Sequence, residues 1–209
     1  MKIILIWQAE PPRDGRLNAA AFARSEEAAR TAFPAPANVR PGDAAGYRIY
    51  TGTSPCAAET AALLFYTDEP PERTALLDDV PLQPFRDTEA ALPLWLWRAL
   101  GAAQWRLGSP RQSETAKETL ARAEAFADRV EADGRDCAVI SRGLTMAALK
   151  TVLRRRGYLL EGGELLPRPL DRVRASKRSE HCGGCHHNCL LSQAKCRIGQ
   201  EKAARQSSG

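Results

Sequence analysis

Histidine is almost absent from this chain of 209 residues: there are three, and all of them lie in the last 29 residues, as His181, His186 and His187. An imidazole is the usual nucleophile or general base of enzymes that work near neutral pH. Chemistry that depends on an imidazole is therefore excluded for residues 1–180.

Long hydrophobic runs are also missing. The apolar run nearest the start covers only residues 3–7, which is too short for the core of a signal peptide or for a membrane span. We therefore expect a cytoplasmic protein with no membrane partner. In that compartment the six cysteines are predicted to be thiols or metal ligands rather than disulfides.

Charge is present but unevenly distributed. With 44% hydrophobic and 26% charged residues, the chain has the composition of a soluble globular protein with one sizeable core. From residue 168 onward there are nine Lys/Arg and three Asp/Glu, which gives this part a net charge of +6. Because the whole chain has a net charge of +5, residues 1–167 carry a net charge of −1. We predict a near-neutral body over residues 1–167 and a basic tail over 168–209.

Short apolar runs alternate with amphipathic stretches along the body, without an internal repeat. Runs rich in isoleucine or valine predict buried strands, and apolar residues at three- and four-residue spacing predict helices. The alternation predicts an α/β fold with three α/β/α layers around a mostly parallel sheet. The expected strands are 2–7, 47–51, 73–77 and 137–141, with a hairpin over 158–166, and the expected helices are 17–33, 57–66, 95–107, 113–133 and 144–156.

Three of these segments carry motifs. The first strand runs into Trp7-Gln8, residues 50–61 read Tyr-Thr-Gly-Thr-Ser-Pro-Cys-Ala-Ala-Glu-Thr-Ala with Cys56 after the proline, and the strand at 137–141 runs into Arg142-Gly. In this order the segments resemble the motifs of the histidine phosphatase (phosphoglycerate mutase-like) superfamily. The resemblance covers about three quarters of the chain, and its tryptophan-rich segment at 92–105 is similar to one bacterial branch of that superfamily.

The resemblance implies a scaffold without its catalytic groups. The superfamily has an arginine and a histidine where this chain has Trp7 and Gln8, an arginine at Cys56 and a second histidine at Arg142. An amide nitrogen such as that of Gln8 has no free lone pair to attack phosphorus, and Trp7 and Cys56 cannot clamp phosphoryl oxygens as arginines do. We therefore expect no catalytic residues and a pseudoenzyme rather than a phosphatase or mutase.

Two residues of the motifs have open roles. Arg142 is either a relic that pairs with Glu10 or a group that holds a small anionic ligand in the remodelled pocket. Cys56 precedes a predicted helix, where a thiolate is favoured, but a cysteine phosphatase needs an arginine six positions later, and that position is Ala62. The same test for Cys137 gives a glycine, so both cysteines are interpreted as packed apolar residues.

The tail carries a second signal. Cys182, Cys185, Cys189 and Cys196 form a C-x2-C-x3-C-x6-C array within 15 residues, and the glycines between the first two allow their sulfurs to converge on one ion. The array predicts a metal knuckle over 181–196, with zinc favoured and an Fe–S cluster as the alternative. A ligand set of three cysteines and one histidine, or a disordered tail with free thiols, also stays open.

The basic tail leaves its partner undecided. Positive charge favours a nucleic acid or another polyanion, but four thiolates offset part of it, and no aromatic residue follows Tyr158 to stack on bases. A solvated, charge-balancing tail is therefore favoured. Two functions remain: a non-catalytic histidine-phosphatase-like domain that binds a protein or a small anion, or a metal-dependent function of the tail, by Fe–S redox chemistry or zinc-knuckle polyanion recognition.

Overall fold

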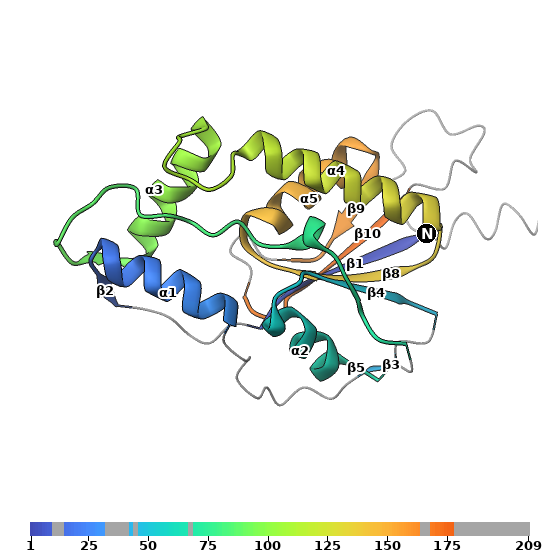
Figure 1. Cartoon of the computed structure of the whole chain (residues 1–209). Helices are drawn as coiled ribbons and strands as arrows, with labels where there is room; N and C mark the ends of the chain where they lie inside the picture. The colour runs from blue at the N-terminus through green and yellow to red at the C-terminus, as the bar shows by residue number, and fades with distance from the viewer. Residues whose placement is uncertain (10–14, 32–41, 44–45, 67–68, 164–167, 178–209) are drawn as a thin grey trace, which may run out of the picture. The chain divides into compact units, whose positions relative to one another are not determined.

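A six-stranded sheet in the order β6-β4-β8-β1-β10-β9 organises the protein. The computed structural model describes residues 1–9, 15–31, 42–43, 46–66, 69–163 and 168–177. Strands β6, β4, β8 and β1 are parallel, whereas β10 is antiparallel to both β1 and β9. The prediction of a mostly parallel α/β sheet is confirmed (Figure 1).

The described elements follow one another in strand–helix alternation. They are β1 (Lys2–Trp7), β2 (Arg16–Leu17), α1 (Ala19–Thr31), β3 (Gly42–Asp43), β4 (Arg48–Thr51), α2 (Pro55–Leu64), β5 (Phe65–Tyr66), β6 (Glu72–Arg73), the 3-10 helix η1 (Ala75–Leu77), β7 (Leu92–Pro93), α3 (Leu94–Leu107), α4 (Ala116–Asp133), β8 (Cys137–Ser141), α5 (Gly143–Arg155), β9 (Tyr158–Glu161) and β10 (Arg172–Lys177).

Helices cover both faces of the sheet because its inner strands are apolar on both sides. Every residue of β8 is buried, as expected for a parallel strand inside a sheet. One face packs against α4 and α5, in a core that includes Leu5, Val139 and Leu149. The other face packs against α2, where Ile140 meets Ala61. Figure 1 shows α4 and α5 on one side of the sheet and α2 on the other.

The helix ends follow from local sequence. Helix α2 begins at Pro55 with Ser54 as its cap, since the Ser54 side chain accepts a hydrogen bond from the Ala57 amide. Helix α4 begins with a capping box in which Thr115 and Glu118 bond each other's backbone, and it ends at Gly134 in the left-handed conformation. These signals explain why the predicted helices agree with the observed ones to within a few residues.

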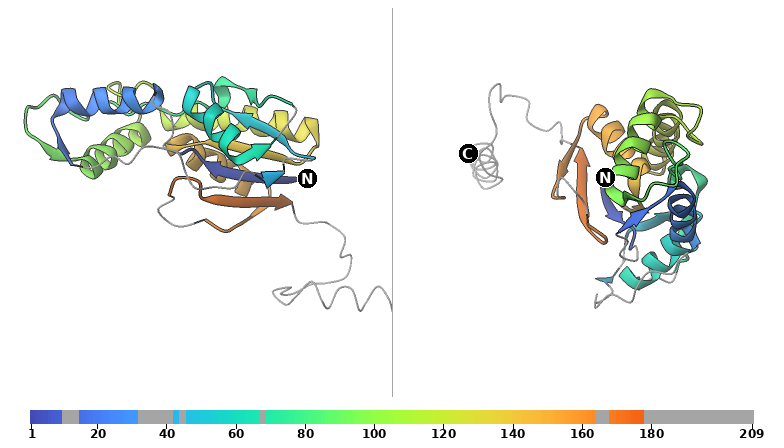
Figure 2. Two further views of the ribbon diagram at one scale, coloured as in Figure 1. Left: turned by 90° about the horizontal axis from the view of Figure 1, so that it is seen from below. Right: turned by 90° about the vertical axis from the view of Figure 1, so that its left-hand side faces the viewer.

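A lobe formed by α1, α3 and the β2–β7 pair lies beyond one end of the sheet (Figure 2). Its separate core includes Phe22 stacked on Trp97, with their ring centroids 5.4 Å apart. The Trp97 indole also donates to the Leu17 carbonyl at 2.8 Å. Helix α1 thereby has a fixed position from which Glu26 reaches the body of the protein.

Three predictions are corrected. Residues 172–177, assigned to the basic tail, form β10, which lies between β1 and β9 in the sheet, so the body extends to Lys177 rather than to residue 167. Within the described part of the expected hairpin, residues 158–163, the strand is β9, and its partner is β10. The strand expected over 73–77 is limited to Glu72–Arg73, because the Thr74 side chain caps the 3-10 turn that follows.

No helix among the described residues is long and apolar enough to span a membrane. Residues 178–209 form a second unit outside the described residues, and the cysteine array at 182–196 lies within it. The metal site proposed there therefore stays a prediction.

Candidate functional site

A cavity of about 200 Å³ opens where the parallel strands β1, β4 and β8 end. The carboxyl ends of parallel strands are the usual position of ligand sites in open α/β sheets. Two of the four motif positions from the sequence meet here, because Gln8 follows β1 and Arg142 follows β8. The described lining residues are Gln8, Glu27, Arg30, Thr31, Thr53, Ser54, Pro55, Asp78, Asp79 and Arg142.

Gln8 is fixed at the floor of this cavity. Its backbone amide donates to the Ser141 carbonyl at 2.9 Å, which continues the pairing of β1 with β8 beyond Trp7. The side chain is only 4% exposed, and its Oε1 accepts a hydrogen bond from the Ser54 hydroxyl at 3.5 Å. A neutral carboxamide therefore occupies the position where the family resemblance implies a nucleophile.

Arg142 caps the start of α5 and is 5% exposed. Its Nε lies 2.7 Å from Oδ2 of Asp79, and a terminal nitrogen lies 3.8 Å from a carboxylate oxygen of Glu26. Glu26 is in turn 3.5 Å from Arg98 of α3. Two carboxylates thus balance the buried guanidinium, and the chain of charges links the lobe to the end of β8. The pairing of Arg142 with Glu10 falls outside the described residues.

Asp78 and Asp79 are site residues that the sequence analysis missed. They follow η1, and their carboxylates lie at the two neighbouring strand ends: Asp78 accepts from the Thr53 amide at 2.5 Å, and Asp79 pairs with Arg142. The strand expected from the sequence ends at residue 77, and no role is expected for the Asp-Asp pair that follows it. Its contacts are 25 and 63 residues away in sequence, so no local pattern indicates them.

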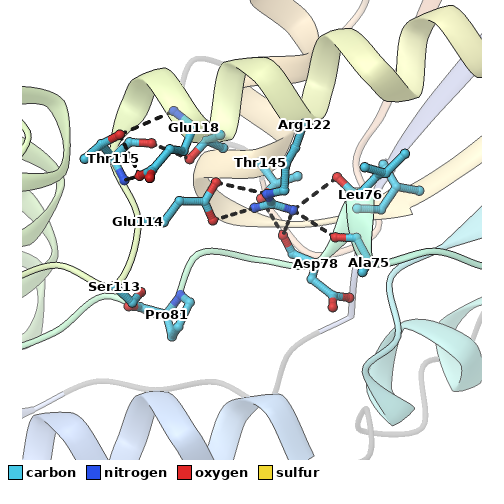
Figure 3. A network of polar contacts seen from close by, with 12 residues as sticks. Ala75, Leu76, Asp78, Pro81, Ser113, Glu114, Thr115, Glu118, Arg122 and Thr145 are labelled. Atoms are coloured by element: carbon cyan, nitrogen blue, oxygen red, sulfur yellow. Dashed lines mark hydrogen bonds and ion pairs between the residues drawn. The ribbon is translucent and has the colours of Figure 1, made fainter.

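Arg122 of α4 holds the backbone of this acidic loop in place (Figure 3). Its guanidinium donates to the carbonyls of Ala75, Leu76 and Asp78, at 3.0, 3.2 and 3.0 Å, and it is itself bound at 2.9 Å by both carboxylate oxygens of Glu114. A fork of five N–H donors is suited to several acceptors at once. The position of the two aspartates is therefore fixed from the opposite side of the loop.

The end of β8 and the first turn of α5 bind the same loop. The Ser141 hydroxyl donates to the Leu77 carbonyl at 2.8 Å, and the Thr145 hydroxyl donates to the Asp78 carbonyl at 2.7 Å. Each carbonyl from Ala75 to Asp78 thus receives a side-chain hydrogen bond. These hydrogen bonds hold the loop in place at the site.

The other two motif positions do not line the cavity. Trp7 packs in the core beneath α4 and α5, with the Lys150 ammonium 5.2 Å from its ring centre. Cys56 is fully buried, and its thiol donates to the Ala9 carbonyl at 3.0 Å. Cys137 is also buried, and burial, followed by the charges of Asp136 and Asp133, raises the pKa of its thiol to about 12.

A second cavity of about 220 Å³ lies behind the first, between the lobe and the start of α5. Asp79 and Arg142 line both cavities, so their ion pair forms the wall between them. The remaining described lining residues are Glu26, Val80, Leu82, Arg98, Ala102, Gly143 and Leu144.

The chemical capacity of the site is narrow. None of the described lining residues is a histidine, cysteine or lysine. The Ser54 hydroxyl caps α2 and donates to Gln8, so it has no adjacent base that would activate it. Among the described residues, no group of three or more His, Cys, Asp or Glu side chains is arranged to hold a metal ion. The described site can bind by hydrogen bonds and charge, and a hydroxyl–carboxylate contact in it joins Thr53 to Asp78, whose carboxylate also accepts from the Thr53 amide.

Comparisons with known proteins give limited similarity. No family model and no curated protein matches the chain. Among solved structures, it is similar to a mycobacterial glucosyl-3-phosphoglycerate phosphatase in complex with VO3 (TM-score 0.41, 13% identity, 74% of this chain and 82% of the other). It is also similar to phosphoserine phosphatase from Entamoeba histolytica in complex with 3-phosphoglyceric acid (TM-score 0.43, 11% identity, 74% and 80%). With TM-scores below 0.5, these similarities establish neither the family nor a shared activity.

Proposed function

We propose that residues 1–177 form a non-catalytic, histidine-phosphatase-like domain that binds a small ligand or a protein partner at the cavity without covalent chemistry. The observation that carries the proposal is Gln8, a buried carboxamide at the end of β1, bonded to Ser54 and facing the cavity. A carboxamide donates and accepts hydrogen bonds, but it can neither attack phosphorus nor carry a phosphoryl group.

The other positions at which the family resemblance implies catalytic groups also hold residues that cannot perform those roles. Arg142 has no nitrogen lone pair to act as a base, and its charge is held by Asp79 and Glu26. Trp7 and Cys56 lie in packed interiors and supply no cation to the cavity. Loss of one such group removes several kcal/mol of transition-state stabilisation, or several decades in rate. The combination therefore supports binding without turnover.

Hydrolysis of p-nitrophenyl phosphate by the purified full chain tests this proposal. We expect no turnover above the buffer rate in the wild type, in Gln8→Ala or in Arg142→Ala. A folded Asp87→Asn variant, altered at an exposed residue away from the cavity, serves as the control for protein preparation. Activity that co-purifies with the wild type, persists in Asp87→Asn and disappears in Arg142→Ala would overturn the proposal.

A second function is carried by the cysteine array. Four cysteines within residues 182–196 favour a bound metal, with zinc in a structural knuckle as the first candidate and an Fe–S cluster as the second. With the tail limited to residues 178–209, five Lys/Arg and two Glu remain, a net charge of +3 rather than +6, which lessens the case for a nucleic acid. Metal analysis separates the two: colourless protein with one zinc supports the knuckle, and brown protein with iron and acid-labile sulfide supports redox chemistry.

A further inference from the structure

The cavity has the geometry of an anion site. Pro55, the first residue of α2, and Arg142, the N-cap residue of α5, both line it, and Arg142 supplies a buried cation. Helix N-termini and guanidinium groups both favour negative charge, and together they form a strong subsite for a phosphate or sulfate group. What fills these positions therefore determines the specificity of the cavity.

Asp79 fills the position at α5. Its Oδ2 is 2.7 Å from Nε of Arg142, and its carboxylate lies directly against the first residue of the helix. A Cβ at Gly143 would lie 2.4 Å from Oδ1 of Asp79, and this glycine has a φ of +55°. The close approach and the backbone conformation both favour glycine here. The carboxylate of Asp79 thus lies beside Arg142 and the start of α5, where its charge opposes that of a bound anion.

Asp78 fills the position at the turn into α2. One carboxylate oxygen accepts from the Thr53 amide at 2.5 Å, and the Thr53 hydroxyl lies 2.9 and 2.7 Å from the two oxygens. Here too a glycine allows the approach, because a Cβ at Gly52 would lie 3.0 Å from the same carboxylate. The donors at this strand end are therefore directed to a carboxylate of the protein itself.

The backbone that carries both carboxylates is held in place. The loop that bears them is bound through its carbonyls by Arg122, Ser141 and Thr145. Asp79 also has little exposed surface, since its side chain is 14% exposed. The two negative charges are consequently a fixed part of the cavity wall, in the way that preorganised groups are fixed in a binding site.

We infer that the carboxylates of Asp78 and Asp79 occupy the anion subsites of the cavity and thereby determine its specificity. The cavity rejects phosphate groups and accepts ligand groups without negative charge. The described lining then carries three carboxylates against two guanidiniums, and the Gln8 carboxamide and Ser54 hydroxyl contribute neutral hydrogen-bonding groups. The inference deepens the proposed binding role and relies on it. It also gives Arg142 a new role, as the partner of Asp79 rather than a receptor for an external anion.

Titration with inorganic phosphate tests this inference, by calorimetry and by the line width of the phosphate signal in phosphorus NMR. We expect no binding of millimolar phosphate to the wild type and a gain in affinity of about a hundredfold in Asp79→Asn, which removes the competing charge while keeping the size of the side chain. Asp87→Asn removes an exposed carboxylate outside the cavity and should behave as the wild type. Arg142→Gln added to Asp79→Asn should abolish the gained binding.

Phosphate binding by the wild type, as tight as in Asp79→Asn, would overturn the inference, as would a folded Asp79→Asn variant that binds none. Circular dichroism and the urea midpoint establish whether that variant is folded. If it is not, Asp79→Ser, which retains a hydrogen-bonding group beside Arg142, takes its place, and the wild-type titration still decides against the inference if phosphate binds. Turnover of p-nitrophenyl phosphate bears on the proposed function, whereas phosphate binding without turnover bears only on this inference.

Discussion

Removal of the Arg122 side chain should destabilise the protein more than removal of any exposed arginine. Arg122 joins α4 to the acidic loop through three backbone carbonyls and a two-point ion pair with Glu114. In Arg122→Ala those carbonyls lose their donor, and the Glu114 carboxylate loses its counter-charge. The side chains of the pair are 23% and 20% exposed, so water replaces the lost bonds only in part.

The expected magnitude follows from these contacts. A hydrogen bond to a charged group contributes about 1.5–3 kcal/mol when it is buried, and partial exposure lowers that contribution. Taken together, the lost bonds should reduce the free energy of unfolding by about 2–4 kcal/mol, or about 1–2 M in the urea midpoint. Arg122→Lys keeps the charge but loses the fork, so it should fall between Arg122→Ala and the wild type.

Arg111 provides a matched control because it makes the same type of contact at the surface. Its guanidinium bonds both carboxylate oxygens of Asp87 at 3.0 Å, but the side chains are 42% and 84% exposed. Arg111→Ala should therefore leave the urea midpoint unchanged within error. Equal destabilisation by Arg122→Ala and Arg111→Ala, with unchanged slopes, would refute the idea that Arg122 holds the loop.

Three further predictions concern the cavity, the core and the tail. Gln8→His alone should give no phosphohistidine signal on mass spectrometry after incubation with acetyl phosphate, because Asp79 holds the charge of Arg142; a stable phosphorylated adduct would show that the cavity accepts phosphoryl groups after all. The free energy of unfolding should fall above pH 9, because folding raises the pKa of the Cys137 thiol to about 12. The contribution of this thiol to stability is complete below its pKa in the unfolded chain and is lost as the pH rises, by up to about 1.4 kcal/mol per pH unit. In urea titrations between pH 8 and 11 Cys137→Ala should flatten this decline, and an identical slope in both proteins would exclude the thiol as its source. EDTA or Cys185→Ser should increase proteolysis within residues 178–209 while leaving the main thermal transition unchanged; melting of the whole protein by EDTA would place the metal in the body instead.

Much of the fold was predictable because its central elements bury one face or both. The strands at 2–7 and 137–141 were predicted with their observed bounds, since each is a short apolar run between polar breaks. Helix α4 was predicted from its apolar stripe, and its start shifts to Ala116 only because Thr115 forms the cap. Such signals are local, so they can be detected in a single sequence.

Strand β10 was missed although its pattern is visible. Arg172 and Arg174 alternate with the buried Val173 and Ala175, as expected for a strand with one buried face, but the arginines were counted as the charge of a tail. The error shows that charge assigned without periodicity can hide a strand. Half of the net charge assigned to the tail belongs to the body, which lessens the case for a nucleic acid as the partner of the tail.

The acidic loop could not be predicted for a different reason. Asp78 and Asp79 lie in the cavity only because β4 and β8 are neighbours in the sheet, which places Thr53 and Arg142 on either side of η1. The glycines at 52 and 143 are the only local trace of this arrangement, and each becomes meaningful once the carboxylate that lies against it is known. Long-range electrostatic pairing of this kind requires the topology first.

The complete burial of both body cysteines limits the rate at which a thiol reagent can reach them. Cys56 and Cys137 are 0% and 1% exposed, so a thiol reagent can reach them only when the body opens globally. The four remaining thiols all belong to residues 178–209. In labelling of the native protein, the reaction of Cys56 and Cys137 would therefore report how often the body opens.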